Sequence, residues 1–97
     1  MKINELVKMI GVPIEITQEL DEVSGEWESY HASFRGSAEF KRFSERSILA
    51  SPLGIGTTKR EALKNLIERI STYDLIVINA SNYESRVEYK VPDKITI

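Results

Sequence analysis

The chain has 97 residues, of which 41% are hydrophobic and 29% charged, with a formal net charge of −2 and no cysteine. This composition predicts one soluble globular domain over residues 1–97, and the lack of cysteine excludes disulfides, a thiolate nucleophile and cysteine-ligated zinc. The opening segment does not resemble a signal peptide, and no apolar run approaches the ~20 residues of a membrane span, so we expect a cytoplasmic protein without a membrane partner.

The first twenty residues predict a helix followed by a strand. The helix covers residues 2–10, and its apolar stripe consists of Ile3, Leu6, Val7 and Ile10. Gly11 and Pro13 end this helix, because proline cannot continue it. From Val12 to Ile16 every second residue is apolar and β-branched, which is typical of a strand.

The segment from residue 21 to 51 predicts a loop and then two or three strands. A polar loop at 21–26 leads into a strand at 27–35, and Gly36 with Ser37 forms a turn after it. One face of this strand carries Tyr30, Ala32 and Phe34, and the other carries Trp27, Ser29, His31, Ser33 and Arg35. Residues 38–51 continue either as one bent strand or as two short strands.

Residues 58–71 predict the second helix. Its apolar face consists of Ala62, Leu63, Leu66, Ile67 and Ile70. Thr58 and Glu61 have the spacing of a capping box, in which the threonine hydroxyl accepts from the amide of Glu61 and the glutamate accepts from the amide of Thr58.

The last quarter of the chain predicts a hairpin. Residues 74–78 read Asp-Leu-Ile-Val-Ile, with an apolar run of strand length after the aspartate, residues 86–91 alternate, and Pro92 ends the second strand. Short loops between strands favour antiparallel pairing, and two amphipathic helices need a sheet face to cover. The expected fold is therefore α+β, with one antiparallel sheet, two helices on one face and the order α-β-β-β-α-β-β.

The stretch GIGTTKREA at residues 54–62 is the most distinctive motif. It does not fit a dinucleotide-binding fingerprint, because Lys59 stands where the third glycine would be, and it lacks P-loop spacing. It resembles the start of the last helix of double-stranded RNA-binding domains, G-x-G-x-S-K-K-x-A-K. The matching positions are Gly54, Gly56, Thr58, Lys59, Arg60 and Ala62. The third basic position of that pattern is Leu63, and Lys64 follows one residue later.

This resemblance implies a similar fold, extended by the C-terminal hairpin, and binding of double-stranded RNA through Lys59, Arg60 and Lys64. The same stretch also resembles the HicB-like antitoxin domain, whose helix opens G-x-T-x-x-E-A-x-x-N. The positions shared with that domain are Gly56, Thr58, Glu61, Ala62 and Asn65. Because the two kinds of domain resemble each other in fold, we interpret the motif first as a capped strand-to-helix turn.

A longer resemblance spans residues 27 to 92. Trp27, the sequence ASF at 32–34, GIGTTKREAL and the closing R-V-E-Y-K-VP are similar to small uncharacterised accessory proteins of phages of Gram-positive bacteria. The resemblance implies a phage or prophage accessory protein that acts in the cytoplasm of the host cell.

Few residues have the chemistry of a catalytic site. His31 is the only histidine, and Ser29 and Ser33 flank it on one face of a strand. A histidine in this setting is usually a solvent-facing residue of a strand and not a general base. No calcium-loop pattern is present in the sequence. We therefore expect no enzymatic activity, no catalytic residue, no cofactor and no metal site.

The charge is distributed unevenly along the chain. Residues 1–34 carry a balance of −5, residues 35–69 a balance of +4 and residues 70–97 a balance of −1. The basic segment 35–69 contains Arg42 as well as Lys59, Arg60 and Lys64, and Trp27 adds an aromatic side chain of the kind that anchors protein interfaces. We take these five residues as binding candidates.

The function expected from these observations is that of a non-enzymatic phage-type protein. It would act by contact with a host or phage protein, for example by inhibiting a host defence or regulatory protein. The first alternative is binding of double-stranded RNA through the start of the second helix. The second is a self-associating structural protein, a homodimer in which strands 74–78 and 86–91 pair across a two-fold axis.

Overall fold

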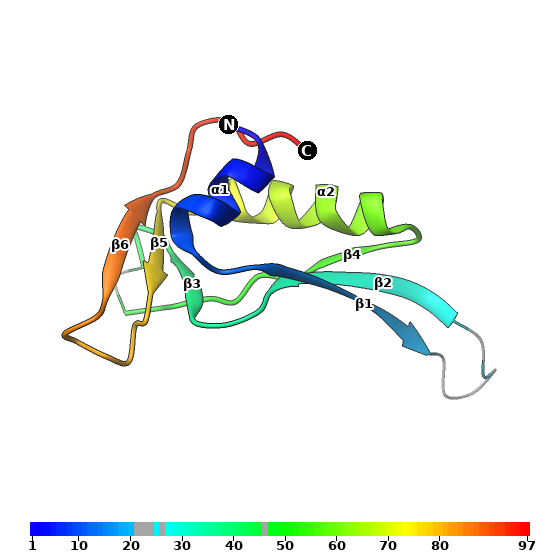
Figure 1. Cartoon of the computed structure of the whole chain (residues 1–97), viewed down its shortest axis with the longest axis horizontal. Coiled ribbons are helices and arrows are strands. Elements are labelled where there is room, and N and C mark those ends of the chain that lie inside the picture. The colour runs from blue at the N-terminus through cyan, green and yellow to red at the C-terminus, as the bar shows by residue number, and fades with distance from the viewer. Residues whose placement is uncertain (21–24, 26, 46) are drawn as a thin grey trace.

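The computed structural model describes residues 1–20, 25, 27–45 and 47–97. Over these residues the chain is an α+β domain of two helices and six strands (Figure 1). The elements are α1 (Ile3–Ile10), β1 (Ile14–Leu20), β2 (Trp27–Phe34), β3 (Ala38–Lys41), β4 (Gly54–Gly56), α2 (Lys59–Ile70), β5 (Leu75–Ile78) and β6 (Val87–Lys90). The loop predicted at residues 21–26 lies, except for Gly25, outside the described residues.

The first sheet has the strand order β1-β2-β4 and is antiparallel throughout. Both helices lie on the same face of this sheet (Figure 1). The predicted alternation of β2 is confirmed, since Ala32 is fully buried and Tyr30 and Phe34 pack against the core. The opposite face of the sheet carries His31, which pairs in register with Thr17 and Ile55.

The second sheet has the order β3-β5-β6 and is also antiparallel. The prediction of a single sheet with three strands before the second helix was wrong, because four strands precede α2 and β3 pairs with β5 instead of joining β1 and β2. The physical reason is the turn at Gly36, which has a φ of 132° and redirects the chain so that the apolar residues of β3 meet the apolar run of β5. The predicted hairpin between residues 74–78 and 86–91 is confirmed by the antiparallel β5–β6 pair.

The described part of residues 38–51 contains one regular strand and one isolated bridge. The strand is β3, and Phe40 at its centre exchanges backbone hydrogen bonds with Ala50 at 2.8 and 2.9 Å. The bridge thus occupies part of the β3 edge that β5 leaves free.

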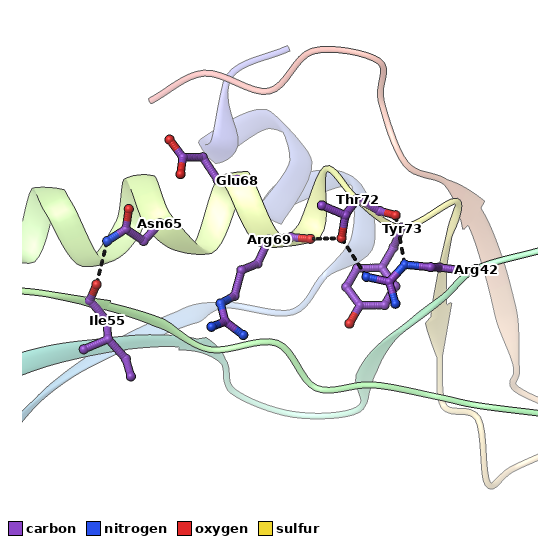
Figure 2. Close-up of a pocket in the computed structure, with 7 residues that line it drawn as sticks. All are labelled: Arg42, Ile55, Asn65, Glu68, Arg69, Thr72 and Tyr73. Atoms are coloured by element: carbon purple, nitrogen blue, oxygen red, sulfur yellow. Dashed lines mark hydrogen bonds between the residues drawn. The ribbon is translucent and has the colours of Figure 1, made fainter. Parts of the chain in front are cut away.

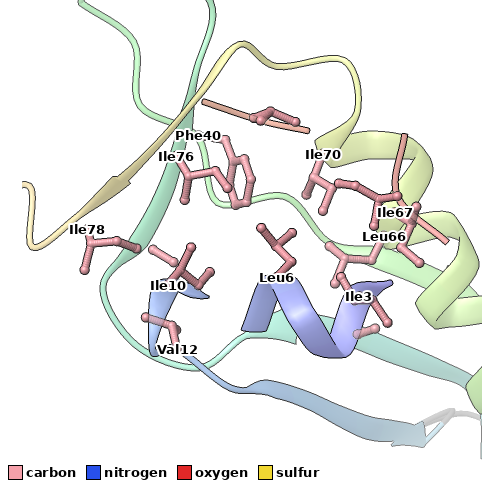
Figure 3. Packing of buried hydrophobic residues seen from close by; sticks show 14 of the residues in the cluster. Ile3, Leu6, Ile10, Val12, Phe40, Leu66, Ile67, Ile70, Ile76 and Ile78 are labelled. Atoms are coloured by element: carbon pink, nitrogen blue, oxygen red, sulfur yellow. The ribbon is translucent and has the colours of Figure 1, made fainter. Parts of the chain in front are cut away.

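One hydrophobic core connects both sheets and both helices (Figure 3). The side chains at its centre are Leu6 of α1, Leu66 and Ile70 of α2, Phe40 of β3 and Ile76 of β5, all fully buried. The ring centroid of Phe40 lies 5.4 Å from that of Phe34 and 5.8 Å from that of Tyr73. Phe40 therefore links the second sheet to the first sheet and to the end of α2.

Helix α2 begins as the sequence predicted, with one difference. The Thr58 hydroxyl accepts a hydrogen bond from the amide of Glu61 at 3.0 Å, which confirms the cap. The Glu61 carboxylate does not complete the predicted box at Thr58. It accepts instead from the amide of Thr57 at 3.4 Å and from the Thr57 hydroxyl at 3.1 Å, because Thr57 offers both donors immediately before the cap.

Strand β4 packs against α2 without side chains in between. A Cβ atom on Gly54 would overlap the carbonyl oxygen of Ala62 and the amide of Leu66, and one on Gly56 would lie 2.5 Å from the amide of Ala62. The two glycines of the motif therefore serve the close approach of a strand to a helix backbone.

The C-terminal segment returns beside α1, so that the two ends of the chain lie close together (Figure 1). The amide of Ile3 donates to the carbonyl of Thr96 at 2.7 Å, and the amide of Thr96 donates to the carbonyl of Met1 at 2.9 Å. Ile95 is buried in the core. This backbone pairing holds residues 95–97 next to α2.

Candidate functional site

A groove of about 510 Å³ lies between α2 and the C-terminal segment. We call it the α2 groove. It is lined by Arg60, Lys64, Ile67, Glu68, Ile95, Thr96 and Ile97. Because Arg60, Lys64 and Glu68 follow one another at intervals of four residues, they occupy one side of the helix and line the groove along its length.

The α2 groove combines apolar and basic side chains. Ile67 and Ile95 are buried at 7% and 8% exposure, whereas Ile97 is 40% exposed. Arg60 and Lys64 are exposed. The groove can therefore accept an apolar side chain and place acidic groups of the same ligand near two cations.

The structure brings together only part of the predicted basic site. Lys59, Arg60 and Lys64 are all exposed on α2, but only Arg60 and Lys64 line the groove. Lys59 is the first residue of α2 and lies outside the α2 groove. A difference in behaviour between Lys59 and the other two residues can consequently separate binding at the groove from binding at the helix terminus.

Arg42 lies in a different place, in a cavity of about 360 Å³ (Figure 2). This cavity is lined by Arg42, Ile55, Asn65, Glu68, Arg69, Thr72 and Tyr73. The Arg42 guanidinium donates to the carbonyl oxygen of Thr72 at 3.2 Å and to its hydroxyl at 3.0 Å, and it stacks 4.1 Å above the Tyr73 ring centroid. Arg42 thus joins the end of β3 to the end of α2, where a cation also complements the helix dipole.

Other residues of the motif are also engaged in contacts within the chain. Asn65, which the resemblance to HicB-like domains singled out, donates its side-chain amide to the carbonyl of Ile55 at 2.6 Å (Figure 2). This hydrogen bond attaches β4 to α2. Together with the Thr58 cap and the close approach at Gly54, it agrees with the interpretation of the motif as a strand-to-helix turn.

A second polar cluster lies on the outer face of the first sheet. The Ser29 hydroxyl is 3.2 Å from Nε2 of His31, and a carboxylate oxygen of Glu19 is 3.7 Å from Nδ1 of the same ring. The sequence indicates that the serine lies beside the histidine but gives no sign of Glu19, which the β1–β2 register brings opposite Ser29.

The order of these three groups is that of a catalytic triad, but acyl transfer also requires donors aimed at a developing oxyanion. The cluster lies on open strands, and its three residues line neither of the two cavities described above. We therefore regard it as part of a polar sheet surface.

Trp27 begins β2 and pairs in register with Leu20, while its side chain lies outside the described part of the structure. In the described residues, no three His, Asp or Glu side chains gather in a way that could hold a metal ion. Neither helix in that part of the chain has the length and apolar character needed to cross a bilayer.

Comparisons of the chain with protein-family models, with curated proteins and with solved structures found no match.

Proposed function

We propose that this protein is a non-enzymatic binding protein that acts by contacting another protein through the α2 groove. The observation that carries the proposal is the position of Arg60 and Lys64 beside the apolar residues Ile67 and Ile95. The resemblance to phage accessory proteins adds that the partner is a host or phage protein, and inhibition of a host defence or regulatory protein would suit a binding protein of this size.

The composition of the groove specifies the chemistry of the partner. The exposed Ile97 beside the buried Ile67 and Ile95 favours an apolar anchor. Among the side chains that line the groove, two cations against one carboxylate, that of Glu68, favour acidic groups flanking that anchor. The partner segment is therefore expected to carry a large apolar residue next to aspartate or glutamate.

The test starts with capture of the partner from nuclease-treated lysate of a Gram-positive host, followed by calorimetry with the purified partner. Arg60→Glu combined with Lys64→Glu is expected to weaken binding about 100-fold, since two rim charges become repulsive to an acidic segment. Both side chains are exposed, so the fold should persist, and circular dichroism checks this. Unchanged affinity in the double variant would refute the proposal.

Lys59→Glu provides the matched control, because it reverses one charge on the same helix outside the groove. Its affinity for the partner is expected to stay within about two-fold of the wild type. A replacement of Ile97 by a photo-reactive amino acid then locates the contact. The cross-linked peptide of the partner should contain the predicted acidic and apolar residues.

Binding of double-stranded RNA is the second candidate. It is supported by the exposure of Lys59 and Arg60 in the first turn of α2 and by the order α1-β1-β2-β4-α2 with both helices on one face (Figure 1). The Glu61 carboxylate weakens this candidate, because it lies at Thr57, where it would repel a phosphate.

The two candidates make opposite predictions for Lys59. If the helix terminus binds RNA, Lys59→Glu reduces affinity as strongly as Arg60→Glu, and log affinity falls by about 0.9 per log unit of salt for each phosphate contacted. If the groove binds protein, Lys59→Glu has little effect on the affinity for the partner protein, and neither variant changes an affinity for RNA in this way. Titration of a labelled RNA duplex with both variants at several salt concentrations distinguishes the two.

A further inference from the structure

Strand β6 forms an edge of the second sheet. The sheet order β3-β5-β6 leaves β6 with one paired side among the described strands. The amide of Val91 donates to the carbonyl of Asp74 at 2.9 Å, and Tyr89 pairs with Ile76. Because hydrogen bonding alternates along an antiparallel ladder, the odd-numbered residues direct their backbone groups toward β5. The backbone groups of Glu88 and Lys90 therefore point away from the sheet.

The sequence of this edge is complementary to itself. Residues 87–91 read Val-Glu-Tyr-Lys-Val. If a second copy pairs antiparallel about Tyr89, valine lies opposite valine, Glu88 opposite Lys90 and Lys90 opposite Glu88. Opposite charges that face each other across two strands stabilise the pair.

We propose that two copies of this chain pair along β6 about a two-fold axis at Tyr89, so that the two second sheets become one six-stranded sheet. Backbone hydrogen bonding restricts the neighbouring registers to axes at Glu88 or at Lys90, because only residues with outward backbone groups can bond to each other. An axis at Glu88 places two glutamates face to face, and an axis at Lys90 places two lysines face to face. Of these three axes, only the one at Tyr89 brings opposite charges together.

The side chains at this edge are free to make the contact. Val87 is 44% exposed, and Glu88 and Lys90 are exposed. Glu88 already accepts a hydrogen bond from Arg86 at 3.0 Å, and its side chain is 44% exposed, so that it can take a second cation. At position 92 proline has no amide to donate, and the pairing therefore ends there.

The edge formed by β1 has the opposite character. Strand β1 forms one edge of the first sheet, and its seven residues make it longer than β4 at the other edge. Pairing of two β1 strands over their full length would centre on Thr17 and would place Glu15 opposite Glu19 of the second copy. Like charges at such positions discourage pairing. Of these two edges, β6 is therefore the one that favours self-association.

A charge-exchange experiment tests the pairing. The wild type is expected to form a concentration-dependent dimer at low ionic strength in analytical ultracentrifugation, with weak affinity because the paired segment is short. Glu88→Lys and Lys90→Glu alone should each weaken the dimer about ten-fold, since each creates two like-charge contacts. The double exchange should restore wild-type affinity. A mixture of the two single variants should form a heterodimer more readily than either forms a homodimer.

Each result decides the proposal. Restoration in the double exchange and preferential heterodimer formation support the axis at Tyr89. A protein that stays monomeric at the highest soluble concentration, or a dimer that ignores both single substitutions, overturns it. Thermal unfolding of each variant verifies that its fold is intact. No residue of the α2 groove belongs to β6, so failure of the groove proposal would leave this one standing.

Discussion

The two sheets of this protein are specified in different ways. Both helices and strands β1 and β2 of the first sheet follow from local signals, namely the stripe of α1, the alternation of β2 and the capped start of α2, and only β4 joins this sheet from beyond β3. The second sheet depends on pairing between β3 and β5, which lie on opposite sides of α2 in the sequence. Closing such a long loop costs conformational entropy that only tertiary contacts can offset. The second sheet is therefore expected to form only together with the shared core.

Phe40 is the residue at which the two regions depend on each other most. Phe40→Ala is expected to lower the free energy of unfolding by about 4 kcal/mol, because it removes a fully buried ring between both sheets. Hydrogen exchange should then show loss of protection in both sheets together. Phe43→Ala, at a 61% exposed phenylalanine, is the control and should change stability little. Loss of protection confined to β3, β5 and β6 would show instead that the first sheet is stable alone.

Gly54 tests the close packing within the first region. Gly54→Ala is expected to cost about 3 kcal/mol, since the new Cβ would overlap the backbone of α2 at Ala62 and Leu66. Gly11→Ala is the matched control. It has no atom within 4 Å of the new Cβ but a φ of 72°, so its cost is about 1 kcal/mol. Chemical denaturation that gives equal losses of unfolding free energy for both variants would contradict the close approach of β4 to α2.

Loss of the α2 cap is expected to lower the free energy of unfolding less than Phe40→Ala or Gly54→Ala does. Thr58→Ala removes the hydrogen bond to the amide of Glu61 and should cost about 1 kcal/mol. Thr57→Ala removes only the exposed contact to the Glu61 carboxylate and should cost a few tenths of a kcal/mol. Thermal unfolding that ranks the two substitutions in the reverse order would show that Thr57, rather than Thr58, caps the helix.

The candidate site could be anticipated from the sequence only in part. The basic residues of α2 were recognised from their resemblance to a phosphate-binding helix, but Ile95 and Ile97 carry no comparable signal. They reach Arg60 and Lys64 because the C-terminal segment pairs with Lys2 and Ile3 at the start of the chain. The position of Arg42 in the basic segment 35–69 predicts a place beside the other cations. Its contacts with Thr72 and Tyr73 place it in a different cavity.

The sequence by itself determined both helices, the alternation of β2, the C-terminal hairpin and the cap at Thr58, because each of these depends on residues within one continuous segment. The tertiary structure alone decided that the described residues form two sheets, that Phe40 joins them and that β6 pairs on one side only among the described strands. Such choices depend on which apolar segments meet across long loops. Several pairings of similar strands would satisfy the local pattern equally well, and only burial of a single common core selects among them.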